Sequence, residues 1–141
     1  MAEPDFSALW AGFRGNKAKD RDRVIVGVAA AFALVAAANG KLEQSETARF
    51  LDVVRGSRLA PSDSAVAAEL ASAFESLAHA MLQSPELGRS ESLRVLSDFG
   101  FDPMRSEIIW SATRAALVAD GQLDADERRA EQEIRAALQI R

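Results

Sequence analysis

Apolar residues recur along most of the chain at the three-and-four spacing of one helical face, and no long stretch alternates like a half-buried strand. Only 4 prolines interrupt this pattern, and alanine, the best helix former, is frequent. The pattern therefore predicts an all-α fold, a compact bundle of about seven helices. The expected ranges are 5–14, 22–38, 43–54, a helix that follows a cap at Ser62 or Ser64, then 85–99, 103–120 and 124–138.

Two of the expected helices begin with residues typical of a helix start. Ser84 precedes Pro85, and Asp102 precedes Pro103, so each pair offers a side-chain cap followed by a proline that needs no hydrogen-bond partner. Gly100 is expected to end the helix before the second pair.

The most apolar stretch, VIVGVAAAFALVAAA at 24–38, follows a basic segment and so imitates a signal peptide. Asp20 and Asp22 interrupt that basic segment, and the stretch is shorter than the about 20 residues of a membrane span. We therefore expect a buried helix in a cytoplasmic protein that touches membranes at most peripherally. Trp10 is also expected to pack onto the bundle, and Trp110 to lie in the core.

Length and composition limit the possible function. The chain of 141 residues with 48% apolar residues suits one domain, with a helix and charged connection over 1–21 and a core over 22–141. It has no cysteine and one histidine, His79, which excludes thiolate and multi-histidine metal sites. The net charge of −4 argues against nucleic acid as a partner. The arginines of the last helix alternate with Glu131 and Glu133 and predict a solvated face.

An acidic segment near the C-terminus is repeated earlier in the chain. The stretch VADGQLDADE at 118–127 has four acids within the eight residues 120–127. A shift of 81 positions (121 minus 40) lays it over AANGKLEQSE at 37–46. Each stretch lies between two expected helices, so the repeat predicts two helix hairpins related by a pseudo-twofold. The shift pairs Asn39 with Asp120, Gly40 with Gly121, Glu43 with Asp124 and Glu46 with Glu127.

Two interpretations of the acidic segment stay open. In the first, Gly121 ends one helix in a left-handed conformation, and Asp124 with Glu127 forms a capping box that contributes about 1 kcal/mol. In the second, the oxygens at three recurring positions bind a hard cation. Two observations favour the cation: neither cap needs Asp120, and Glu43 is a poor cap residue in the other copy. The spacing is not that of an EF-hand.

The two motifs resemble the A-D-G-x-[LI]-x-x-x-E turn of the TerB-like tellurite-resistance family, over a region that runs from about residue 22 to the C-terminus. The resemblance implies two similar helical halves, an acidic cluster that binds divalent cations, and no catalytic activity. It also implies a part in bacterial stress response or defence, beside protein partners that can be membrane-associated. The implied ligands are Asp120, Asp124, Glu127, Glu43 and Glu46, with Asn39 in place of the family's aspartate.

The sequence thus predicts a non-enzymatic TerB-like domain that binds Ca²⁺ or Mg²⁺ weakly, with a dissociation constant on the order of 10⁻⁴–10⁻³ M. The alternative is a metal-free helical module for protein interaction, in which the acidic turns act only as caps. The sequence carries no signal for an oligomeric state.

Overall fold

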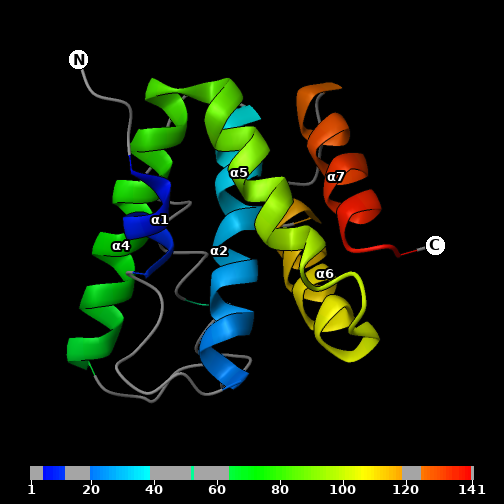
Figure 1. The fold of residues 1–141 in the computed structure, drawn as a ribbon, viewed down its shortest axis with the longest axis horizontal. Helices are drawn as coiled ribbons and strands as arrows, with labels where there is room; N and C mark the ends of the chain where they lie inside the picture. The colour runs from blue at the N-terminus through cyan, green and yellow to red at the C-terminus, as the bar shows by residue number, and fades with distance from the viewer. Residues whose placement is uncertain (1–4, 12–19, 39–51, 53–63, 119–124, 141) are drawn as a thin grey trace.

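The computed structural model describes residues 5–11, 20–38, 52, 64–118 and 125–140. These residues form six helices and no strand, which confirms the all-α fold (Figure 1). The expected helix over 43–54 lies outside the described residues except for Asp52, and so does the hairpin repeat that depends on it. The helices are α1 (Phe6–Ala11), α2 (Asp20–Ala38), α4 (Ser64–Gln83), α5 (Pro85–Ser97), α6 (Pro103–Val118) and α7 (Ala125–Ala137).

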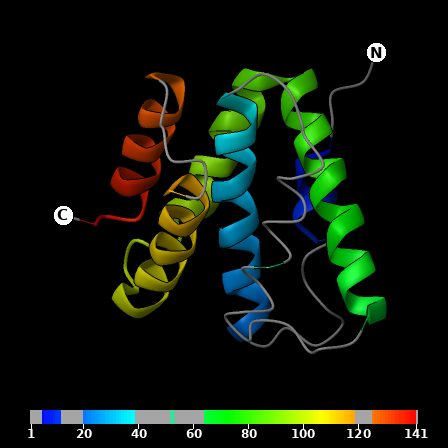
Figure 2. The same cartoon turned by 180° about the vertical axis from the view of Figure 1, so that it is seen from behind.

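Helix α2 is the centre of the bundle and packs against α4, α5, α6 and α7. Both views show it between α4 on one side and the α6–α7 pair on the other (Figures 1 and 2). Every residue from Val24 to Leu34 is buried, as the prediction of a buried helix required. Among the described helices, none has both the length and the apolar character needed to cross a membrane.

Helix α1 packs onto the bundle through its aromatic face, as predicted. Phe6 and Trp10 are 4% and 3% exposed, and their ring centroids are 6.1 Å apart. The Trp10 indole Nε1 also donates a hydrogen bond of 3.4 Å to Glu91 Oε2 on α5. The aromatic face is thus used for packing.

Helices α4 and α5 are joined by a single residue, Ser84. Its N–H donates to the Ala80 carbonyl at 2.9 Å, and its carbonyl accepts from the Gly88 N–H at 2.8 Å. The predicted side-chain cap is wrong, because the Ser84 hydroxyl makes no cap hydrogen bond. With its backbone serving both helices at once, Ser84 needs no separate capping turn. A Cβ on Gly88 would lie 2.9 Å from Met81 Cγ, so glycine permits the close approach of α4 and α5.

The start of α6 follows the prediction. Asp102 Oδ1 accepts a hydrogen bond of 3.1 Å from the Arg105 N–H, which is the expected side-chain cap before Pro103. Trp110 is 8% exposed and belongs to the core, as expected. Ile108 is 37% exposed, because α6 turns Ser106, Ile109 and Thr113 inward.

Helix α7 packs through one face only. Ala130, Ile134 and Leu138 are buried at the predicted spacing, with 7%, 0% and 1% exposure. The arginines at 128, 129 and 135 are exposed, in agreement with the predicted solvated face.

Candidate functional site

The predicted cation ligands fall mostly on the segments between helices. Helix α6 ends at Val118 and α7 begins at Ala125, so the acidic segment lies between two helices, as expected. Of the six candidates, only Glu127 is within the described residues. The others, Asn39, Glu43, Glu46, Asp120 and Asp124, lie outside them.

Glu127 is an unusual carboxylate because it is only 7% exposed. Glutamate is almost never fully buried unless it has a partner, and Glu127 does take part in a polar interaction. It is the third residue of α7, where a capping box places its glutamate. Its position therefore fits the cap interpretation and the cation interpretation equally well.

The side chains of the six predicted ligands suit a hard cation. It consists of one amide and five carboxylates, and Ca²⁺ and Mg²⁺ prefer such oxygen ligands. Within the part of the chain that the structure describes, no three acidic or histidine side chains come together as a metal site.

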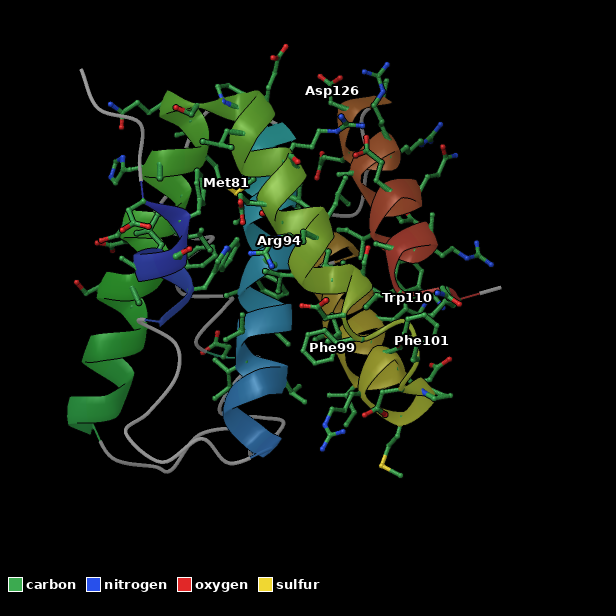
Figure 3. All side chains as sticks on the ribbon, in the orientation of Figure 1. Met81, Arg94, Phe99, Phe101, Trp110 and Asp126 are labelled. Carbon is green, nitrogen blue, oxygen red and sulfur yellow. The ribbon has the colours of Figure 1, made fainter. Side chains whose placement is uncertain are left out.

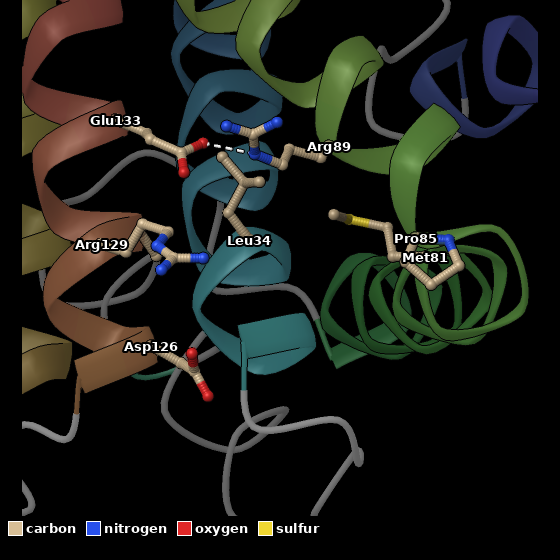
Figure 4. A pocket seen from close by; sticks show the side chains of 8 residues that line it. Leu34, Met81, Pro85, Arg89, Asp126, Arg129 and Glu133 are labelled. Atoms are coloured by element: carbon tan, nitrogen blue, oxygen red, sulfur yellow. Dashed lines mark hydrogen bonds and ion pairs between the residues drawn. The ribbon is translucent and has the colours of Figure 1, made fainter.

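A cavity of about 450 Å³ lies between α2, α4, α5 and α7, close to the start of α7 (Figure 4). Its apolar wall is formed by Leu34, Met81, Pro85 and Ala130. Its polar side chains come from α5 and α7, and are Arg89, Asp126, Arg129 and Glu133.

One ion pair spans this cavity. Arg89 Nε donates to Glu133 Oε2 at 2.6 Å and so connects α5 to α7. The hydrogen bond to Glu133 and the charge of that carboxylate raise the pKa of the Arg89 guanidinium above its ordinary value. Arg129 also lines the cavity and points from α7 toward α2 in Figure 4. No ion pair joins Arg129 to any other described residue.

A second polar cluster, on α5, serves packing. Arg94 Nη2 and Nε donate to Glu91 Oε2 at 2.8 and 3.2 Å. The hydrogen bond from Arg94 lowers the pKa of Glu91, and the one from Trp10 acts in the same direction, while partial burial opposes both.

His79, the one histidine, is exposed on α4.

A third feature is an apolar surface at the junction of α5 and α6. Phe101 is 88% exposed and Met104 is 76% exposed, with Ile108 one turn further along α6. Figure 3 shows the Phe101 side chain at this junction, away from the central helix. Large apolar side chains as exposed as Phe101 and Met104, which lie three residues apart in the chain, are candidates for a contact surface.

Comparison of the chain with protein-family models, with curated proteins and with solved structures found no match.

Sequence reasoning did not find the cavity. The spacing of Arg129 and Glu133 places both on one side of α7, and that signal was present in the chain. The partner of Glu133 is Arg89, which lies 44 residues earlier on another helix. No local pattern predicts such a distant contact, so the arginines of α7 looked like an ordinary solvated face.

Proposed function

We propose that this chain is a non-enzymatic, TerB-like helical module that binds a divalent cation, Ca²⁺ or Mg²⁺, through the acidic segment before α7. The observation that supports the proposal best is the buried carboxylate of Glu127, which lies three residues after Asp124 and seven after Asp120 in the chain. A buried carboxylate next to further oxygen donors is the arrangement in which a hard cation offsets the cost of desolvating a charge.

The proposed setting is a bacterial stress-response or tellurite-resistance assembly. The module would act in the cytoplasm, beside protein partners that can be membrane-associated. Its contribution would be a cation-dependent change in the stability of the α6–α7 pair. With few protein ligands the affinity would be weak, with a dissociation constant on the order of 10⁻⁴–10⁻³ M.

Thermal unfolding tests the proposal. The protein is unfolded in EDTA, and then in Ca²⁺, Mg²⁺ or Mn²⁺ at constant ionic strength. A cation at its dissociation constant stabilises the fold by about 0.4 kcal/mol, and at ten times that concentration by about 1.4 kcal/mol. For a domain of this size, the second value corresponds to a rise in Tm of about 4 °C.

Variants separate a cation site from a cap. Asp120→Asn combined with Asp124→Asn, and separately Glu127→Gln, are expected to abolish the cation response while the helical circular dichroism remains. Glu131→Gln removes the same charge one turn further along α7 and should keep the full response. A wild type that shows no rise with any of the three cations would refute the cation proposal and leave the segment as an acid-capped turn.

The alternative function, a metal-free interaction module, is favoured by one observation of its own: the exposed Phe101 and Met104. A photo-crosslinking residue at position 101 is expected to capture one dominant protein in cells, whereas the same residue at the exposed position 90 captures none. Equal labelling from both positions would argue against a docking surface.

A further inference from the structure

We infer that the cavity between α2, α4, α5 and α7 is a binding site for a small monocarboxylate with an apolar body, and that Arg129 holds the carboxylate. None of its described lining residues is a candidate cation ligand, so the inference does not rest on the cation proposal. It rests on the shape of the cavity and on the interactions of the four charged side chains among its described lining residues.

The shape suits a small organic molecule. A volume of about 450 Å³ lies in the usual range of small-molecule sites, about 300–1,000 Å³. Leu34, Met81 and Ala130 are held by packing in the core, with 5%, 1% and 7% exposure, so the edges that they show to the cavity are small and rigid. Met81 is held further by the Ser92 hydroxyl, which donates to its sulfur at 3.4 Å. The apolar wall is therefore preformed.

The charges of the cavity leave a guanidinium for the ligand. Glu133 is engaged by Arg89 at 2.6 Å, so these two side chains neutralise one another. Asp126 lies at the end of the cavity nearest the start of α7, where a negative charge is stabilised by the helix dipole (Figure 4). Arg129 remains between them. It pairs with neither acid among the described residues, although both are within one turn of it on α7.

A guanidinium beside an apolar wall is suited to a carboxylate, which it can bind through two parallel hydrogen bonds. The acidic neighbour of Arg129 further limits which anions the cavity can bind. Asp126 precedes Arg129 by about one turn of α7 and would repel a dianion such as a phosphate monoester, whereas the charge of Glu133 is already neutralised by Arg89. A monoanion meets less repulsion, so the cavity favours a monocarboxylate.

The first test compares octanoate with octanamide, which has the same apolar body and no charge. Binding is measured in EDTA by calorimetry and by amide shifts in NMR spectra. Octanoate is expected to bind about tenfold more tightly than octanamide, since a hydrogen bond to a charged group contributes about that much. Equal affinity for the two compounds, or no binding of octanoate at millimolar concentration, would overturn the inference.

Matched variants locate the site. Arg129→Gln should weaken octanoate about tenfold and leave octanamide unchanged. Arg128→Gln removes an exposed arginine next to it that does not line the cavity, and should bind as the wild type does. An equal loss in both variants would show that only the overall charge of the helix matters, which contradicts the assigned site.

A third variant is expected to bind octanoate more tightly than the wild type does. Glu133→Gln releases Arg89, whose guanidinium then adds an unpaired positive charge to the cavity, so it should tighten octanoate binding. Octyl phosphate is expected to bind the wild type more weakly than octanoate. A tighter phosphate, or weaker octanoate binding in Glu133→Gln, would overturn the assignment of a monocarboxylate.

Discussion

Helices α2 and α7 use their residues in opposite ways. Helix α2 is buried without interruption from Val24 to Leu34 and contacts four other helices. Helix α7 buries Ala130 and Ile134 and leaves its arginines exposed. A helix that is buried on all sides exposes almost no surface, so α2 contributes mainly to stability and adds only Leu34 to the described lining of the cavity. A helix packed through one face can carry charges toward a ligand, and the cavity and the acidic segment both adjoin α7.

The glycine of α2 shows how tight the central packing is. A Cβ on Gly27 would lie 2.4 Å from Ile109 Cδ1 and 3.0 Å from Phe99 Cε2. Glycine in a helix interior costs about 1 kcal/mol relative to alanine, and here it permits α6 to approach α2. Nothing comparable constrains the outer face of α7.

The largest expected difference in stability between α2 and α7 comes from placing one negative charge on each helix. Ala30→Asp puts a carboxylate at a fully buried position of α2 and should cost about 3–5 kcal/mol, because an unpaired charge is buried. Ala136→Asp makes the same change at an exposed position of α7 and should cost about 1 kcal/mol, through helix propensity and the dipole. Urea unfolding followed by circular dichroism measures both. Similar losses in the two variants would mean that α7 is as constrained as α2.

Most of the fold was predictable from the sequence because its signals are local. The apolar stretch 24–38 is too short for a membrane and too apolar for a surface, so a central buried helix was the remaining solution. The Asp102–Pro103 pair also predicted its helix start correctly. The Ser84 cap failed because the sequence does not show that α4 and α5 share that residue.

The second largest expected effect on stability distinguishes the buried face from the exposed face of the outer helices α6 and α7. Ile134→Ala on α7 removes a side chain with 0% exposure and should cost about 3 kcal/mol, through lost burial and a cavity. Ile108→Ala on α6 removes the same atoms from a side chain that is 37% exposed, and should cost less than about 1 kcal/mol. Chemical denaturation gives both values. A larger loss for Ile108→Ala would contradict the inward face assigned to α6.

The candidate sites were less predictable, for two physical reasons. The six cation candidates come from a short repeat, and the same residues can cap helices, so the pattern alone cannot choose between the two functions. The polar side of the cavity depends on the ion pair between Arg89 on α5 and Glu133 on α7. The spacing of apolar residues along the chain does not predict which side chains of two distant helices meet. The exposure of Phe101 follows from the direction of the α5–α6 turn, which composition does not specify.

The third effect concerns the ion pair that ties α7 to α5. Arg89→Gln, Glu133→Gln and the double variant form a cycle whose coupling energy should reach at most about 1 kcal/mol, because the Arg89 side chain is 58% exposed. The coupling should fall at high salt. Unfolding in low and high salt measures it. A coupling that is independent of salt would mean that packing, and not charge, joins the two helices here.

The smallest effect is the pH dependence that Glu91 contributes on the other side of α5. Arg94 lowers the pKa of Glu91 in the folded protein, so its stabilisation is present above the pKa of the unfolded chain, about 4.3, and is lost as the pH falls through the folded value. Glu91→Gln should therefore cost a few tenths of a kcal/mol at pH 7, because the pair with Arg94 is partly exposed, and the cost should be smaller at pH 3. Urea unfolding at the two pH values tests this. A difference that is as large at pH 3 as at pH 7 would mean that the charge of Glu91 is not the cause of its stabilising effect.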